Sequence, residues 1–358
     1  MKLKISLLLI CAVLLTGCST PAAPDTTAAT GPAFTTEPPE TIPPETEPVE
    51  TLPPETEPPE TTQDPVEASR EWFYHVFWEL DPDETERWFA ANPEYLENGY
   101  EGVNVNEAWL GDNGLELYTT LGHQVLAINA EDRILILRAR LAGSRTVMAI
   151  AKLPERLHLY PSAGLGSYGE KVGTIAERYN GVLAMTGSGF IDPEGLGNGG
   201  QIAGWCKCED REYGSPMGYN YARFELGEDN WFTVTRATGR PLDTTTDAME
   251  FEPALLIDGR TQSPGIWTGE NPRACIGQTE RGEILMLGVE GRFDDSPGCS
   301  VTECAKLMQD YGGVNAINVD GGTTAILWYR GQPIMRCSNR SATGGRSLPN
   351  AWVYVKED

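Results

Sequence analysis

The chain has 358 residues, of which 27 are Lys or Arg and 52 are Asp or Glu, so its formal net charge is −25. A protein that binds nucleic acid holds the phosphates with clustered Lys and Arg, and no stretch of this sequence supplies such a basic patch. Nucleic acid is therefore excluded as a partner. The length allows one large domain or two of average size.

The first 17 residues are predicted to be an export signal. Lys2 and Lys4 precede an apolar run from Ile5 to Leu15 that only Ser6 interrupts. The run has about 11 residues, too few to cross a bilayer of roughly 30 Å as a permanent helix. A charged start followed by a short apolar core is typical of a secretory signal that is removed from the mature protein.

Residues 15–18, Leu-Thr-Gly-Cys, resemble the lipobox of bacterial lipoproteins. The resemblance implies cleavage before Cys18 and a lipid on its sulfur. We therefore expect the protein to be exported and held by this lipid at the outer face of the cell membrane. The alternative is an ordinary signal peptide with a chance cysteine at this position.

Residues 18–66 are predicted to be the lipidated cysteine and a disordered linker. Positions 19–66 contain 13 Pro and 10 acidic residues, without any Lys or Arg. This composition favours extended polyproline II, with an upper reach on the order of 150 Å for the whole segment. Removing the two signal lysines and these ten acidic residues from the total leaves a formal charge of −17 on residues 67–358.

Residues 67–358 are predicted to form a single large α+β domain with a mixed, largely antiparallel sheet flanked by helices. Two helical patterns open its first part, 67–150, and the second of them starts at the N-cap Asp81. Alternating and β-branched runs at 124–128, 134–141 and 146–151 then predict antiparallel strands. We expect these N-terminal helices and strands to pack on the main part of the domain, 151–358.

A helix, a buried strand and a glycine-rich turn follow one another twice in this main part. The first series has a helix at 170–179, a strand at 182–185 and a turn that ends at Asp192. The second has a helix at 301–311 that starts with the capping box Ser300 and Glu303, a strand at 316–319 and a turn that begins at Asp320. Because glycine lets a ligand approach the backbone closely, both aspartates are candidate functional residues.

Three other patterns predict no function. Residues 164–169 match the G-x-G-x-x-G fingerprint, but the match stands alone, and an exported protein meets no pool of nicotinamide cofactor. His75, His123 and His158 lie away from the glycine turns and no G-x-S-x-G elbow occurs, so a Ser-His-Asp hydrolase is not expected. Cys206-x-Cys208 lacks the usual spacing of a zinc site.

Six cysteines remain after the signal and the anchor are removed: Cys206, Cys208, Cys275, Cys299, Cys304 and Cys337. Their even number and an export route predict up to three disulfides, with buried free thiols as the alternative. Fifteen pairings are possible for six cysteines, and the sequence does not choose among them.

Several segments of the main part occur in the order found in one known family. They are Pro154–Leu157, Ser188–Pro193, Gly197–Gly200, Leu256–Gly259, Pro272–Gly277, Gly291-Arg292, Asn318–Thr324, Gly345-Arg346 and Pro349–Ala351. From about Leu153 to Val355 the chain resembles the phosphodiester glycosidase domain family. That family cleaves a sugar-1-phosphodiester at the glycosidic bond and leaves a phosphomonoester.

The resemblance implies a surface-anchored hydrolase whose partner is a phosphorylated glycan, such as an N-acetylglucosamine-1-phosphodiester of a cell wall or an exopolysaccharide. For this reaction we expect Asp320 and Asp192 to be the catalytic carboxylates that activate water or stabilise the oxocarbenium-like sugar. Arg273, helped by Arg346 or Arg292, is expected to bind the phosphate. The expected substrate-binding residues are Ser188, Gly189, Asn318, Gly321, Gly322, Thr323, Thr324, Arg292 and Arg346. No cofactor is firmly implied, although paired carboxylates could hold a divalent cation.

The sequence also departs from the family. Thr186 stands where the family usually has Asn, which removes an amide that can both donate and accept a hydrogen bond. An alternative is therefore a catalytically inactive lipoprotein that binds carbohydrate or the cell wall on the same fold. A solute-binding lipoprotein that serves a transporter is a third possibility, but the family segments do not fit it.

Overall fold

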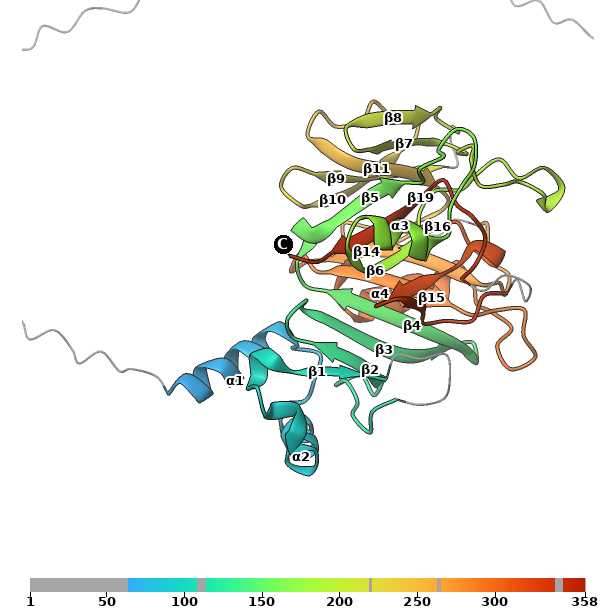
Figure 1. Cartoon of the computed structure of the whole chain (residues 1–358). Coiled ribbons are helices and arrows are strands. Elements are labelled where there is room, and N and C mark those ends of the chain that lie inside the picture. The colour runs from blue at the N-terminus through green and yellow to red at the C-terminus, as the bar shows by residue number, and fades with distance from the viewer. Residues whose placement is uncertain (1–63, 108–113, 219–220, 263–264, 339–343, 358) are drawn as a thin grey trace, which may run out of the picture. The chain divides into compact units, whose positions relative to one another are not determined.

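The computed structural model describes residues 64–107, 114–218, 221–262, 265–338 and 344–357 (Figure 1). The residues from Thr61 to the C-terminus belong to one compact unit. The predicted export signal, the predicted lipidation site Cys18 and the predicted linker up to residue 63 lie outside the described residues. None of the helices described here combines the length and the apolar character that a membrane crossing requires.

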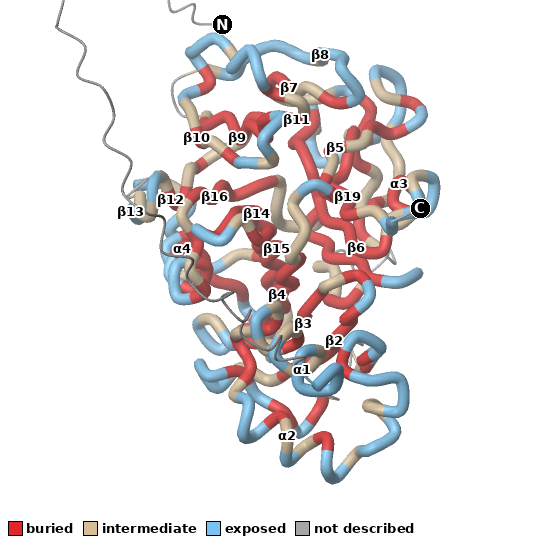
Figure 2. Tube along the Cα trace, turned by 90° about the vertical axis from the view of Figure 1, so that its left-hand side faces the viewer, coloured by how far each residue is buried: buried red, intermediate tan, exposed pale blue. Residues whose placement is uncertain are grey.

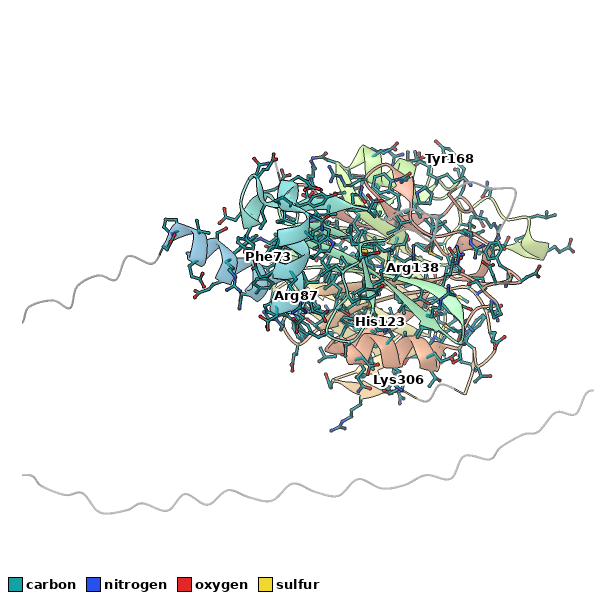
Figure 3. The ribbon with its side chains drawn as sticks, turned by 90° about the horizontal axis from the view of Figure 1, so that it is seen from below. Phe73, Arg87, His123, Arg138, Tyr168 and Lys306 are labelled. Carbon is teal, nitrogen blue, oxygen red and sulfur yellow. The ribbon has the colours of Figure 1, made fainter. Side chains whose placement is uncertain are left out.

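Two helices open the described chain, α1 (Pro65–Val76) and α2 (Pro82–Ala91), and each follows an aspartate N-cap and starts with proline. The predicted N-cap Asp81 is confirmed, since its side chain accepts a hydrogen bond from the Glu84 amide. Phe73 of α1, labelled in Figure 3, is fully buried. The centroids of its ring and of the Phe89 ring in α2 are 5.8 Å apart.

The largest sheet has nine strands in the order β1-β2-β3-β4-β15-β14-β16-β12-β13, and all neighbours are antiparallel. The strands are β1 (Asn104–Asn106), β2 (Gln124–Asn129), β3 (Ile134–Leu141), β4 (Ser144–Ala151), β12 (Ala254–Ile257), β13 (Arg260–Thr261), β14 (Arg273–Thr279), β15 (Ile284–Val289) and β16 (Gly313–Val319). The predicted strands at 124–128, 134–141 and 146–151 are β2, β3 and β4. Because β4 pairs with β15, strands from both sides of residue 150 share one sheet.

Two smaller antiparallel sheets complete the unit, in the orders β10-β9-β11-β7-β8 and β18-β17-β6-β19-β5. Their strands are β5 (Leu157–Pro161), β6 (Gly181–Thr186), β7 (Trp205–Cys208), β8 (Arg211–Gly214), β9 (Ala222–Gly227), β10 (Phe232–Arg236), β11 (Thr245–Phe251), β17 (Leu327–Tyr329), β18 (Gln332–Pro333) and β19 (Asn350–Val355). The α+β class with largely antiparallel strands is confirmed, and the strands are divided among three sheets.

Both faces of the nine-stranded sheet are buried, which follows from apolar residues at consecutive positions. On β3, Ile134 and Ile136 belong to the core shared with the two smaller sheets, whereas Leu135 and Leu137 belong to the core shared with α1 and α4. Figure 2 shows buried residues running through β4, β15 and β14. The three sheets thus share a rigid interior from which loops carry the candidate functional residues.

The helix predicted at 301–311 is α4 (Val301–Asp310), and its capping box of Ser300 and Glu303 is confirmed. Cys304 and Leu307 face the core, while Lys306 is exposed on the opposite side (Figure 3). The other predicted helix is α3 (Val172–Arg178), which packs on the sheet that contains β6. Short 3₁₀ helices are η1 (Pro93–Leu96), η2 (Tyr100–Gly102), η3 (Pro154–Arg156), η4 (Pro193–Gly195) and η5 (Gly322–Thr324).

Candidate active site

One cavity of about 370 Å³ gathers nearly all of the predicted site residues. It is lined by Gly189, Phe190, Asp192, Ala203, Tyr221, Phe251, Trp267, Asn271, Pro272, Arg273, Arg292, Asn318, Asp320, Gly321, Gly322, Thr323, Thr324 and Arg346. Most of these residues lie at the ends of strands or in the loops beside them, around β6, β9, β11, β14, β15, β16 and β19, so all three sheets contribute to the wall. A larger cavity of about 670 Å³ lies between α2 and residues 114–118, and none of the predicted site residues lines it.

Asp320 follows directly after the buried strand β16, which fixes its position. Burial raises the pKa of this carboxyl to about 7, because removal from water disfavours the charged form. A hydrogen bond from Thr324, the charge of Arg346 and the Gly321 amide act in the opposite direction without cancelling the effect of burial. Asp320 can therefore exchange a proton near neutral pH, as a catalytic acid or base must.

Asp192 has the opposite electrostatic setting. Its carboxylate accepts two hydrogen bonds from the Arg346 guanidinium, and its Oδ1 also accepts one from the Gly197 amide at 2.7 Å. The hydrogen bond from Arg346 lowers the pKa of Asp192, so this carboxyl stays ionised where Asp320 is partly protonated. Arg346 also lies over the ring of Phe190, 4.7 Å from its centroid, which fixes the ion pair at the cavity wall.

Arg273 lies at the cavity but is largely engaged by the protein itself. Its Nε donates to the carbonyl of Cys299 at 3.0 Å, and its Nη2 donates to the carbonyls of Trp267 and Gly269 at 2.9 and 2.8 Å. Only 3% of this residue is exposed. These contacts make Arg273 a brace between the start of β14 and two loops.

Arg292 presents its guanidinium more openly than Arg273 does. The residue is exposed, and its Nη2 donates to Asn271 Oδ1 at 3.1 Å. Its backbone has φ of +64°, a left-handed conformation that is unfavourable for a side chain of this size. Gly322 also has φ of +64°, and a Cβ there would lie 3.3 Å from Arg292 Nη2. The left-handed backbone of these two residues thus places the Arg292 guanidinium over the η5 turn.

Ser188 and Thr186 lie behind the cavity wall. The Ser188 amide donates to Asn350 Oδ1 at 2.7 Å, and its Oγ accepts from Asn350 Nδ2 at 3.0 Å. Ser188 is buried and, among the described residues, is not part of the cavity lining. Thr186 Oγ1 donates to the carbonyl of Thr324 at 2.7 Å and accepts from the Ile326 amide at 3.0 Å. Thr186 therefore secures the residues that follow Asp320.

Asn318 anchors the same region from another side. Its Nδ2 donates to the carbonyl of Glu252 at 2.8 Å, and its own amide donates to the carbonyl of Pro253 at 3.0 Å. Gly189 lies close to the Phe251 ring, since a Cβ at position 189 would come within 2.6 Å of it. Asn318 and Gly189 thus join the end of β11 to the two glycine-rich turns.

The aromatic part of the cavity wall was not predictable from the sequence. Tyr221, Phe251 and Trp267 come from separate loops and strand ends, and no local pattern marks them as neighbours. Trp267 is 43% exposed, an unusual exposure for so large an apolar surface next to carboxylates. Flat aromatic faces beside polar groups suit a ligand with both apolar and polar sides, such as a sugar ring.

The described part of the chain contains neither a disulfide nor a cluster of side chains suited to bind a metal ion. All six cysteines from Cys206 to Cys337 are thiols there, so the structure contains none of the disulfides that the sequence predicts. Within the same residues, no group of three or more His, Cys, Asp or Glu side chains is placed to hold a metal ion.

Residues 182–355 match the family model described as phosphodiester glycosidase. This part of the chain is therefore similar to the phosphodiester glycosidase family. Among solved structures, the catalytic domain of zebrafish N-acetylglucosamine-1-phosphodiester α-N-acetylglucosaminidase, auto-inhibited by its pro-peptide, is similar with a TM-score of 0.51 and 18% identity. The similarity covers 63% of this chain and 82% of that one. The family's fold is thereby confirmed for this domain.

Two further structures are more distant. A Synechocystis protein has a TM-score of 0.43 and 14% identity over 64% of this chain and 63% of its own. A Burkholderia pseudomallei protein has a TM-score of 0.47 and 13% identity over 60% of this chain and 76% of its own. No curated protein sequence matches the chain.

Proposed function

We propose that the protein hydrolyses the glycosidic bond of a sugar-1-phosphodiester, releasing the sugar and a phosphomonoester. The observation that carries this proposal is the pairing, within one cavity, of a carboxyl with a pKa of about 7, Asp320, and an exposed guanidinium, Arg292. The first group moves a proton near neutral pH, and the second binds the charge of a leaving phosphate.

In this mechanism ionised Asp320 accepts a proton from the attacking water as the water oxygen bonds to the anomeric carbon. The bond between that carbon and the phosphate oxygen breaks, and its electrons leave with the phosphate. Because a phosphate is a good leaving group without protonation, a fixed cation replaces the acid of ordinary glycoside hydrolysis.

We assign the phosphate to Arg292 rather than to Arg273. The contacts of Arg273 with the carbonyls of Cys299, Trp267 and Gly269 would have to break before it could form a two-pronged contact with phosphate through Nε and Nη2. Arg292 gives up at most its hydrogen bond to Asn271. Arg346 contributes positive charge nearby while it stays paired with Asp192.

The sugar is assigned to the aromatic side of the cavity, where Trp267 and Phe251 offer flat faces. The zebrafish relative is named for an N-acetylglucosamine-1-phosphodiester, and we propose the same class of substrate here, carried on a cell-wall or exopolysaccharide glycan. Lipidation of Cys18 and the acidic, proline-rich segment after it would hold the enzyme at the outer face of the membrane.

The test uses the purified full chain with UDP-N-acetylglucosamine or a methyl N-acetylglucosamine-1-phosphate, and free sugar is measured. Release of sugar by the wild type and its loss in Asp320→Asn, with unchanged far-ultraviolet circular dichroism, is the expected result. Full activity of Asp320→Asn would reject the role of this carboxyl. Binding of the substrate without release would favour the second candidate, an inactive glycan-binding module, which the departure at Thr186 supports.

A further inference from the structure

Two buried cysteines meet at the start of α4. The sulfur atoms of Cys299 and Cys304 are 3.4 Å apart, and neither residue is exposed. A disulfide has its sulfur atoms about 2.05 Å apart. The two thiols would therefore have to approach by only about 1.4 Å, which a small rotation about the side-chain bonds supplies.

The sequence around α4 builds this contact. Ser300 is the N-cap, so Cys299 is the residue before the cap and Cys304 is the fourth residue of the helix. These two positions regularly pack against each other at helix starts, in the arrangement called the hydrophobic staple. The capping box of Ser300 and Glu303 holds the chain in the required direction, because both of its hydrogen bonds are present.

We propose that Cys299 and Cys304 form a disulfide that joins the start of α4 covalently to the wall of the active site. Each thiol gives up one electron and one proton. The oxidant is a small-molecule or protein disulfide, whose S–S bond takes up both electrons and both protons and becomes two thiols.

This thiol–disulfide exchange takes place while the chain is still folding. Both side chains are fully buried once α4 has packed, so an oxidant cannot reach them in the folded domain. The hydrogen bond between the two thiols, together with burial, raises the pKa of Cys299 well above its usual range, which further slows attack by its thiolate.

The other cysteines are less suited to pairing. Cys206 and Cys208 are separated by one residue on the same strand, β7, where alternate backbone positions stand about 6.6 Å apart, although the two thiols contact each other through a hydrogen bond. A disulfide needs Cβ atoms within about 4.5 Å, so this pair is expected to stay reduced. Cys275 is the cysteine that could pair with Cys304 in place of Cys299, because it lies beside Cys304. Its thiol also contacts Asn318.

The proposed bond bears on the site because Cys299 supports two of its residues through the backbone. Its carbonyl accepts from Arg273 Nε at 3.0 Å and from the Asn271 amide at 3.2 Å, and its amide donates to the Asn271 carbonyl at 3.1 Å. Asn271 in turn accepts a hydrogen bond from Arg292. A disulfide that fixes Cys299 would therefore also fix the backbone that accepts the hydrogen bond from Arg273 and the backbone of Asn271, the partner of Arg292.

The test maps thiols in the full chain. The protein is unfolded with reductant, refolded in a mixture of reduced and oxidised glutathione, alkylated with iodoacetamide and digested with trypsin, which cleaves after Arg292 and Lys306. We expect the peptide 293–306 without alkylation and two hydrogens lighter than its reduced form, while Cys206 and Cys208 are alkylated. A doubly alkylated 293–306, or a peptide linking Cys304 to Cys275, would overturn the proposal.

Two variants complete the experiment. Cys275→Ser removes the competitor and is expected to leave the linked 293–306 peptide in place. Oxidised wild type is expected to unfold roughly 3–5 °C above the reduced protein, and this difference should vanish in the double variant Cys299→Ser, Cys304→Ser. An equal difference in the double variant would assign the effect to other cysteines and contradict the proposal. None of these readouts depends on enzymatic activity, so they are independent of the proposed function.

Discussion

Asp320 and Asp192 are chemically identical, and their neighbours make them different. Asp320 has its pKa raised by burial, whereas Asp192 has its pKa lowered mainly by the hydrogen bond from Arg346. Pairs of carboxyls whose pKa values are separated in this way are typical of sites that use one for proton transfer and keep the other charged. In this cavity Asp320 is therefore the carboxyl that gains and loses a proton near neutral pH.

The raised pKa of Asp320 has a cost in stability. An unfolded chain ionises this carboxyl near pH 3.8, while the folded chain keeps the proton until about pH 7. Folding stability therefore falls as the pH rises between these values, by at most about 4 kcal/mol for the whole interval. We predict that Asp320→Asn raises the thermal midpoint at pH 8 and changes it little at pH 4. Thermal unfolding at the two pH values measures this, and a gain of equal size at both would contradict it.

Arg292 allows a second prediction at this scale. Asn tolerates the left-handed backbone better than most residues, so Arg292→Asn removes the guanidinium without adding strain. We expect KM for a sugar-1-phosphodiester to rise about 10- to 100-fold, because a charge-assisted contact with phosphate is lost. The thermal midpoint should stay within about 2 °C of the wild type.

The matched control for Arg292 is Arg260→Asn, which changes an exposed arginine of β13 and should alter neither quantity. Steady-state kinetics and thermal unfolding of both variants decide the question. An unchanged KM in Arg292→Asn would mean that Arg273 or Arg346, and not Arg292, binds the phosphate.

At the scale of elements, β6 and η5 depend on one hydroxyl. Thr186 Oγ1 bonds both the carbonyl of Thr324 and the amide of Ile326. Thr186→Val keeps the shape and leaves these two buried backbone groups without that partner, so we predict a loss of about 2 kcal/mol in the free energy of unfolding. Urea unfolding measures the loss, and Thr186→Ser serves as the control that keeps the hydroxyl. A Val variant as stable as wild type would show that the turn needs no such anchor.

Elements with simple patterns were predictable from the sequence. The runs that became β2, β3 and β4 are apolar and β-branched, and α4 has a cap, a buried face and a glycine stop. β9 was not predictable in this way, because its interior carries Arg223 and Glu225, which resemble surface residues. Both are buried: Arg223 donates to Glu250 of β11 at 2.8 Å, a partner that no local pattern reveals.

The site shows the same limit. Asp320 and Asp192 stand in glycine-rich turns after predicted strands, so their candidacy could be derived locally. Their unequal pKa values depend on Arg346 and on burial, which are properties of the assembled cavity. Likewise, the carbonyls of Cys299 and Trp267 that accept hydrogen bonds from Arg273 come from loops, and no local pattern could predict these contacts.

At the scale of the whole molecule, one buried group of charges joins the N-terminal helices to the nine-stranded sheet. Lys152 follows β4, and its Nζ lies 2.5 Å from Glu79 and 3.0 Å from Glu283. All three side chains are at most 6% exposed. Burial raises the pKa of Glu79, so this carboxylate depends on the lysine for its charge. The group fixes the connection between α1 and α2 to the ends of β4 and β15.

Lys152→Met would leave the buried carboxylate of Glu79 without its cation, while Glu283 would keep Arg281 at 3.7 Å. We predict a loss of about 3–5 kcal/mol at pH 7 and a smaller loss at pH 5, because the Glu79 carboxyl, whose pKa would rise further without the lysine, becomes neutral as the pH falls. Urea unfolding at both pH values tests this, with Lys306→Met on the exposed side of α4 as the control. A loss that is independent of pH would mean that packing, and not charge, dominates at this position.

The pairing of β5 with β19 has a consequence for the order in which the chain can fold. β5 ends at Pro161, and β19 begins at Asn350, so most of the domain's sequence lies between these two paired strands. β6 also uses β19 as a neighbour, so the sheet that carries Thr186 stays incomplete until the last strand is available. Contacts so distant in sequence make folding slow, because long loops must close before any pairing is gained. This sheet therefore closes only after β19 has been made, and loss of β19 would first disturb the turn that holds Asp320, through Thr186.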